Sequence, residues 1–212
     1  MNIQRTKKFR EMSGNDRDCY MLVYNIGKKK NFGDILRSAA AFGVKEVFVV
    51  GAKKLSLFGN QGTQRYCSFT HFESLEEAKA ELKKRGITLV GIEITDSAVS
   101  VQQHPFTGPT CFMAGNEGSG MNQQQLDACD SFVFIPQYSG ATASLNVATA
   151  TGIVFHHFAL WADKPEQERQ GYKFVMDQPP SYHLNPTEDI LKEAERKREE
   201  RRQKREAESI TN

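Results

Sequence analysis

The sequence contains no long apolar run and no apolar N-terminal segment. None of its runs approaches the roughly 20 consecutive apolar residues that a membrane-spanning helix needs. The start, MNIQRTKKFREMSGNDRD, is polar and lacks the apolar core of a signal peptide. We therefore expect a protein with no membrane partner that acts in the cytoplasm, with the nucleus and the mitochondrion as alternatives.

Cysteine and histidine are few and scattered. The four cysteines include no CxxC pair, which favours free thiols in a reducing compartment over disulfides or a zinc site. The five histidines lack a metal-ligand spacing, and the HExxH motif is absent. The sequence therefore predicts no metal. The residues concerned are Cys19, Cys67, Cys111 and Cys129, and His71, His104, His156, His157 and His183.

Positively and negatively charged side chains are nearly equal in number. The chain has 28 Lys and Arg against 26 Asp and Glu, a formal net charge of +2, so the total does not by itself indicate nucleic-acid binding. Lys28, Lys29 and Lys30 nevertheless stand directly before a predicted helix. A lysine run beside a candidate site suits a phosphate-bearing partner, and a solvated surface is the alternative.

Apolar runs of strand length alternate with helical patterns along most of the chain. Most of the runs are too continuously apolar for half-exposed strands, so we expect buried, mostly parallel strands. The alternation predicts an α/β fold in which helices cover the sheet. The expected strands lie within residues 19–26, 46–51, 87–94, 110–115 and 131–136, and the expected helices within 31–43, 74–86, 122–130 and 144–161.

A chain of 212 residues with 39% hydrophobic content is long enough for one well-buried domain with extensions. We place the domain at residues 19–162, after a basic N-terminal extension at 1–18. A polar, proline-containing linker is expected at 163–187, and a charged helix or tail at 188–212. In that tail the two signs interleave, which suits an exposed helix with i,i+4 pairs that serves solubility or docks to RNA or a partner.

The stretch NFGDILRSAAAFG, residues 31–43, predicts a helix that sets an arginine among small residues. Ile35, Ala39 and Phe42 share the side that would face a core. Arg37 lies on the other side, where a pair with Asp34 would be worth only about 0.2 to 0.5 kcal/mol. The alternative is a guanidinium left accessible to a bulky polar substrate.

The stretch GNEGSGM, residues 115–121, follows an expected strand. Ligands of α/β sheets bind outside the carboxyl ends of strands, and glycines let backbone N–H groups approach a ligand closely. Glu117 adds an anionic acceptor. The stretch matches neither a P-loop nor a dinucleotide fingerprint, so a phosphate cradle is disfavoured, while a plain tight turn remains the structural alternative.

The stretch IPQYSGATASLNVATATG, residues 135–152, joins a strand to a helix. A helix N-cap needs one polar residue, and its contribution is about 1 kcal/mol. Here Ser144 and Asn146 stand where the helix should begin, with further hydroxyl groups before them, and this surplus favours a binding loop. Small residues after the cap keep the helix slim, so that another backbone can approach it.

Together, NFGDILRSAAAFGV, MAGNEGSGM and IPQYSGATASLNVATA resemble, in order, the three sequence motifs of the SpoU/TrmH branch of the SPOUT RNA methyltransferases. The resemblance runs from about Tyr20 to Trp161. It implies an α/β fold with a C-terminal trefoil knot and a homodimer with the slim helix at its interface. It also implies that the protein binds S-adenosylmethionine and methylates a ribose 2′-hydroxyl in tRNA or rRNA.

The resemblance also implies roles for individual residues. The third motif departs from the usual pattern, because it is one residue longer between Ile135 and Leu145 and has Gln137 and Tyr138 where a methionine and a small residue are usual. The implied catalytic residues are Asn31, Arg37, Glu117, Ser144 and Asn146. The implied cofactor-binding residues are Ile94, Thr95, Gly115, Asn116, Glu117, Gly118, Ile135, Ser144, Leu145 and Asn146.

A guanidinium is effectively always protonated in proteins, so Arg37 is a poor general base. We expect it to hold the phosphate beside the target ribose and to stabilise the developing alkoxide, with Glu117 and Asn31 setting its orientation. Two other functions stay open. One is an RNA-binding ribosome-assembly factor with little or no catalytic activity, and the other is a small-molecule enzyme on an ordinary doubly wound sheet.

Overall fold

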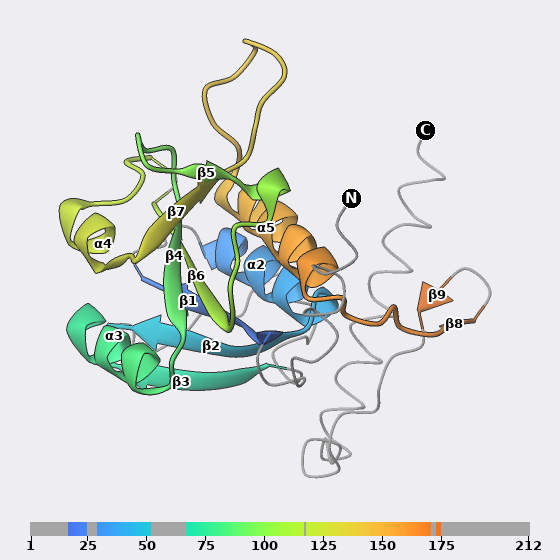
Figure 1. The fold of residues 1–212 in the computed structure, drawn as a ribbon, viewed down its shortest axis with the longest axis horizontal. Coiled ribbons are helices and arrows are strands. Elements are labelled where there is room, and N and C mark those ends of the chain that lie inside the picture. Colours follow the sequence, from blue (N-terminus) through green and yellow to red (C-terminus); the bar gives the residue numbers. More distant parts are fainter. Residues whose placement is uncertain (1–16, 25–28, 52–66, 117, 171–172, 175–212) are drawn as a thin grey trace, which may run out of the picture. The chain divides into compact units, whose positions relative to one another are not determined.

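A computed structural model describes residues 17–24, 29–51, 67–116, 118–170 and 173–174 (Figure 1). The chain divides into two compact units, Met1–Glu166 and Gln167–Asn212. The first unit contains a seven-stranded sheet in which every pair of neighbouring strands is parallel. The predicted α/β class with a mostly parallel sheet is therefore confirmed.

The strand order in this sheet is β3-β2-β1-β6-β4-β7-β5. The five strands expected from continuous apolar runs all form. The sequence did not predict β3, an edge strand whose residues are only partly buried, or β5, which is too short for any periodicity. The bounds are β1 Cys19–Val23, β2 Val44–Val50, β3 Ser68–Phe72, β4 Thr88–Ile92, β5 Val99–Ser100, β6 Thr110–Ala114 and β7 Ser131–Phe134.

Helices cover both faces of the sheet, as Figure 1 shows. The hydrophobic cluster on one face includes residues of α2 and α5, and the cluster on the other face includes residues of α3 and α4. All four helices fall where the sequence predicts them. Their bounds are α2 Lys29–Ala41, α3 Leu75–Lys84, α4 Gln123–Ala128 and α5 Val147–Trp161, and a short 3₁₀ helix, η3, spans Val101–Gln103.

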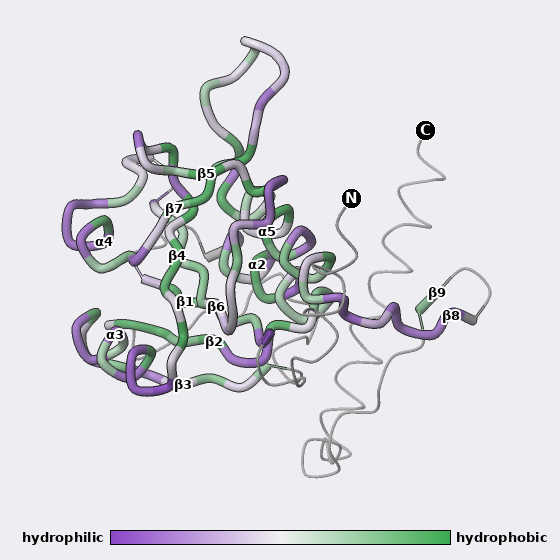
Figure 2. The backbone as a smooth tube through the Cα atoms, in the orientation of Figure 1, coloured by the Kyte–Doolittle hydropathy of each residue, from purple (hydrophilic) through white to green (hydrophobic). Residues whose placement is uncertain are grey.

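Strand β1 explains why the central strands are largely apolar. Met21 and Val23 belong to the cluster beneath α2 and α5, whereas Tyr20 and Leu22 belong to the cluster beneath α3. Successive side chains of a strand point to opposite faces, so a strand covered on both sides has few positions for a polar residue. Figure 2 shows the result, with β4 and most of β2 in hydrophobic colours and hydrophilic residues along α3.

A cluster of aromatic rings fixes α5 on the sheet. Phe158, which is 0% exposed, lies 5.6 Å from Phe112 of β6 and 5.2 Å from Phe106 between ring centroids. Trp161 closes the cluster at 5.1 Å from Phe158. Edge and tilted contacts of this kind add to the burial of apolar area, so this cluster sets the position of α5 and of the loop that precedes it.

The second unit contains a short antiparallel pair, β8 Arg169–Gln170 with β9 Lys173–Phe174. This pair lies within the polar, proline-containing linker predicted for residues 163–187. The sequence did not predict the two strands, because strands of two residues leave no pattern to read. Most of the N-terminal extension, at 1–16, and the whole charged tail at 188–212 lie outside the described residues.

The four cysteines are free thiols, and burial keeps them protonated. It raises the pKa of Cys19 and of Cys129 to about 12, so neither is a thiolate near neutral pH. Within the described ranges, no three His, Cys, Asp or Glu side chains come together as metal ligands would. None of the helices in that part of the chain is long and apolar enough to cross a membrane.

The aromatic cluster makes a stability prediction. We expect Phe158→Ala to lower the free energy of unfolding by about 3–5 kcal/mol, because it removes a buried ring and leaves a cavity. Phe174 of β9 is 57% exposed. Phe174→Ala is therefore the matched control, because it makes the same change at an exposed position, with an expected change within about 0.5 kcal/mol. Urea unfolding followed by circular dichroism measures both, and equal losses would contradict the proposed anchoring of α5.

Candidate active site

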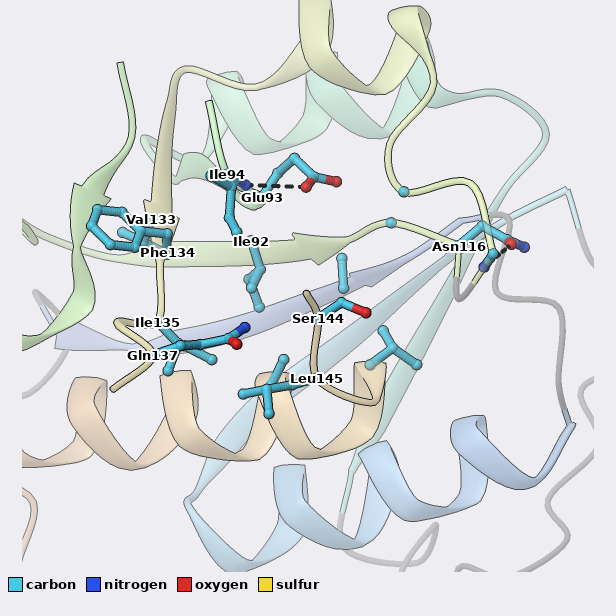
Figure 3. Close-up of a pocket in the computed structure, with 16 residues that line it drawn as sticks. Ile92, Glu93, Ile94, Asn116, Val133, Phe134, Ile135, Gln137, Ser144 and Leu145 are labelled. Atoms are coloured by element: carbon cyan, nitrogen blue, oxygen red, sulfur yellow. Dashed lines mark hydrogen bonds between the residues drawn. The ribbon is translucent and has the colours of Figure 1, made fainter. Parts of the chain in front are cut away.

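A pocket of about 250 Å³ opens where β4, β6 and β7 end (Figure 3). These strands are neighbours in the sheet, so their carboxyl ends meet at one edge, which is where α/β sheets bind ligands. The first turn of α5 closes another side. The lining residues are Ile92, Glu93, Ile94, Ala114, Gly115, Asn116, Gly118, Gly120, Val133, Phe134, Ile135, Gln137, Ser144, Leu145, Val147 and Ala150.

Most of the residues assigned to the cofactor by resemblance line this pocket. They are Ile94, Gly115, Asn116, Gly118, Ile135, Ser144 and Leu145. Thr95 is not among the lining residues, and its hydroxyl lies 3.3 Å from that of Ser97 instead. Asn146 stands at the start of α5, just behind the wall. Glu117 lies outside the described residues.

The glycine-rich stretch after β6, called the glycine loop below, makes a tight turn between Asn116 and Gly120. Asn116 and Gly120 exchange two N–H···O bonds of 2.9 Å each. A Cβ on Gly115 would lie 2.4 Å from the carbonyl carbon of Gly120, and Gly120 itself has φ +69. These two glycines are therefore required by the turn, which fits the purely structural explanation of the motif.

Gly118 differs from the other two glycines. A Cβ at this position would meet only Asn116 Oδ1 at 3.6 Å, an ordinary contact. Its backbone N–H donates to that same oxygen at 2.9 Å. Packing does not require a glycine at this position, but Gly118 lines the pocket, so a large side chain would occupy the space of a ligand.

Glu93 is a lining residue that the sequence did not single out. It follows β4, and among the described lining residues it is the only ionisable one. One carboxylate oxygen accepts from the Met121 N–H at 3.0 Å. The other accepts from the Ile94 N–H at 3.1 Å (Figure 3). The sequence signal that could have identified Glu93 is a carboxylate near the end of the apolar run ITLVGIEI, residues 87–94.

Two predicted catalytic residues meet across the first and third motifs. The Asn146 side-chain oxygen caps α5 by accepting from Ala148 N at 2.9 Å and Thr149 N at 3.3 Å. Its amide nitrogen donates to Asn31 Oδ1 at 3.1 Å, and Asn31 is only 6% exposed on α2. The Asn146 side chain therefore both caps α5 and joins the third motif to the first.

The Ser144 hydroxyl stands apart from this cap. It lines the pocket and makes no hydrogen bond to the part of the chain that the structure describes. The backbone around it is held by Thr142, whose hydroxyl donates to Ser144 O at 2.9 Å. The backbone bonds therefore position Ser144, and its hydroxyl stays available to a ligand in the pocket.

The slim helix expected from the sequence has a close neighbour within the chain. A Cβ on Gly152 would lie 3.2 Å from the Ser38 hydroxyl oxygen, so the glycine lets α5 approach α2. Ala148 is buried in the core, and Ala150 lines the pocket. Within the chain, Ala148 and Gly152 therefore serve packing and Ala150 borders the pocket. The contact between two copies that the family resemblance implies stays a prediction.

Arg37 lies exposed on α2, and the pair with Asp34 does not form. Both residues are described, and the ion pairs among the described residues do not include them. Arg37 is about 9 Å farther along the helix axis than Asn31 and points to a different side, since a helix turns once in about 3.6 residues. The structure thus brings Asn31 and Asn146 together and leaves the Arg37 side chain on the surface.

Comparison with known proteins identifies the family. Residues 18–156 match the model of the SpoU rRNA Methylase family. The chain belongs to this family. The resemblance of the three motifs is therefore confirmed, and the second and third motifs supply most of the residues that line the pocket described above.

Individual relatives of this SpoU-family chain include tRNA (guanosine(18)-2′-O)-methyltransferases. The protein of that name from Aquifex aeolicus is 27% identical over 194 residues, covering 89% of this chain and 87% of the relative. The one from Escherichia coli K12 is 28% identical over 160 residues, covering 74% of this chain and 69% of the relative.

Solved structures of SpoU-family proteins share the fold. The Aquifex aeolicus TrmH/SpoU tRNA modifying enzyme superposes with a TM-score of 0.59 at 25% identity, over 76% of this chain and 84% of that one. The SpoU methyltransferase AviRb from Streptomyces viridochromogenes, solved in complex with AdoMet, gives a TM-score of 0.62 at 24% identity, over 71% and 60% of the two chains.

The glycine loop makes a prediction that separates its two kinds of glycine. We expect Gly115→Ala to lower the free energy of unfolding by about 1–3 kcal/mol, because the new Cβ meets backbone that cannot move aside. Gly118→Ala, the matched control, is expected to change it by less than about 0.5 kcal/mol. Urea unfolding compares the two variants, and equal stability would show that the turn is less tight than described.

Proposed function

We propose that this protein transfers a methyl group from S-adenosylmethionine to a ribose 2′-hydroxyl of tRNA or rRNA. The observation that carries the proposal is the pocket at the ends of β4, β6 and β7, beside which the Asn31–Asn146 contact joins the first motif to the third. Membership of the SpoU family and the names of the relatives support the same activity. A cytoplasmic location stays a prediction.

The pocket fits S-adenosylmethionine in shape and charge. Ile92, Val133 and Leu145 offer apolar walls to a purine ring, and Gly118 leaves space beside them. The carboxylate of Glu93 is fixed by two backbone N–H groups and keeps lone pairs for a cationic or hydroxyl-bearing ligand. When bound, S-adenosylmethionine would supply a methyl group activated by a sulfonium.

On the substrate side, the protein mainly has to orient the ribose. Holding the reacting groups in line can supply roughly 7–11 kcal/mol of a barrier in favourable cases, more than a single proton transfer supplies. Ser144 offers an unused hydroxyl at the pocket, and the Asn31–Asn146 contact fixes the turn that carries it. These residues would position the 2′-oxygen and accept or donate hydrogen bonds to it.

Arg37 supplies positive charge outside the pocket. It is exposed, and the small residues around it leave room for a phosphate. A guanidinium binds phosphate in a bidentate manner and stays protonated, so Arg37 would hold the nucleotide next to the target ribose and stabilise negative charge on the 2′-oxygen. Orientation of Arg37 by Glu117 stays a prediction.

We further propose the trefoil knot and the homodimer that the family resemblance implies. Strand β7 lies between β4 and β5, although only residues 93–98 connect those two strands. The chain thus returns to a gap that an earlier connection already spans, and this arrangement favours a knot. Leu160, which is 58% exposed on α5, is apolar surface that a second copy would cover.

Calorimetric titration with S-adenosylmethionine tests the pocket. We expect the wild type to bind at micromolar strength and Gly118→Arg to bind at least tenfold more weakly, because the arginine fills the pocket without disturbing the turn. Gly118→Ala is the control and should still bind. A folded wild-type protein that does not bind S-adenosylmethionine would contradict the proposal and favour an RNA-binding assembly factor.

Substitution of Arg37 tests its role. We expect Arg37→Ala and Arg37→Lys both to lower kcat/KM for RNA about 10²-fold or more, since neither forms a bidentate contact, while affinity for S-adenosylmethionine stays unchanged. Asp34→Ala is the control and should keep wild-type activity, because Asp34 does not pair with Arg37. An Arg37→Lys variant whose activity rises steeply at alkaline pH would instead assign the residue as a general base.

A further inference from the structure

Tyr138 is the most exposed large hydrophobic side chain among the described residues, at 82%. Single exposed apolar side chains occur on most proteins, so exposure alone indicates little. The Tyr138 hydroxyl, however, accepts a hydrogen bond of 2.6 Å from Gln102 Nε2. The ring is therefore restrained at its tip while its faces stay open to solvent.

The partner of Tyr138 is itself anchored to the domain. Gln102 belongs to η3, whose first residue, Val101, is 0% exposed. At the end of η3, His104 Nε2 lies 3.1 Å from His157 Nδ1 of α5. The contact between the Tyr138 and Gln102 side chains lies on the surface, and the element that carries Gln102 is anchored to the core by Val101 and His104.

Tyr138 is adjacent in the sequence to the wall of the candidate active site. Its neighbour Gln137 lines the pocket, but Tyr138 does not. Tyr138 opens a loop, residues 138–146, that is exposed throughout and extends away from the sheet between β7 and α5 (Figure 1). The loop returns to the pocket at Ser144 and Leu145. Both ends of this exposed loop therefore border the pocket, and Tyr138 stands at one of them.

The loop that carries the ring has no charged side chain. Between Asp130 and Asp163 the chain has no charged side chain, so this loop and all of α5 lack carboxylates that would repel phosphate. The loop offers hydroxyl groups instead. Unpaired RNA bases stack on exposed aromatic rings with little dependence on sequence, because every base has a π-face.

We propose that Tyr138 is a stacking platform for an unpaired base of the RNA substrate beside the target nucleotide. The inference rests on the proposed function, since it takes the substrate to be RNA. A protein partner would need a wider apolar surface than one ring surrounded by small polar residues. A wall of the cofactor site would line the pocket, whereas the bond to Gln102 directs Tyr138 toward η3.

The test compares RNA and cofactor binding in the full chain. The probes are a mixed-sequence single-stranded RNA oligonucleotide, followed by fluorescence anisotropy at fixed salt, and S-adenosylmethionine, followed by calorimetry. We expect Tyr138→Ala to raise the Kd for RNA about 5- to 150-fold, the equivalent of one stacked base. The Kd for S-adenosylmethionine should stay within twofold of the wild type.

Matched variants separate stacking from other effects. Tyr138→Phe keeps the ring and should bind RNA within threefold of the wild type, and Gln102→Ala, which frees the ring, should fall between Tyr138→Phe and Tyr138→Ala. His71→Ala removes an exposed ring on β3, at the opposite edge of the sheet, and should change nothing. The salt dependence of RNA binding should be the same in all variants, because stacking releases no counterions.

Three results would overturn the inference. If Tyr138→Ala binds RNA as the wild type does, the ring is not a stacking platform, and the proposed function is unaffected. If Tyr138→Ala weakens S-adenosylmethionine binding but not RNA binding, the ring belongs to the cofactor site. If the wild type binds no RNA, the proposed function fails with the inference, and the wild-type titration alone shows that.

Discussion

The position of β7 between β4 and β5 is the constraint on which the rest of the site depends. It places the ends of β4, β6 and β7 side by side, and the pocket lies at those ends. It also makes the chain turn back after β7 toward α5, so that Ser144 and Leu145 come beside the glycine loop. Buried, continuously apolar strands allow this order, because each strand packs on both faces.

Structural and chemical roles coincide in this site. Asn146 caps α5 and holds Asn31 with the two ends of one amide group. Gly115 and Gly120 are required by the turn, and Gly118 next to them is required only if a ligand fills the pocket. A motif can therefore have a structural and a functional explanation at the same time. Neighbouring residues of one motif can have different explanations.

Much of the fold could be read from the sequence, and the failures have physical reasons. Continuous apolar runs revealed the buried strands, but β3 is a half-exposed edge and β5 is too short for periodicity. Glu93 was missed because a single carboxylate after a strand is ordinary, and only its bonds to Met121 and Ile94 make it part of the pocket. The small residues of α5 were correctly seen as a place of close approach, but Ser38 of the same chain is the neighbour that the structure shows.

By itself, the sequence determined the α/β class, most of the element positions and the three motifs, because periodicity and residue type are local properties. Only the tertiary structure decided which motif residues meet, since that depends on strand order and on contacts between distant segments. Asn31 and Asn146 are joined across two helices, Thr95 lies off the pocket, and Arg37 stays unpaired with Asp34. A local pattern can indicate that a segment has more polar side chains than a helix cap needs, but the fold determines which atoms those side chains face.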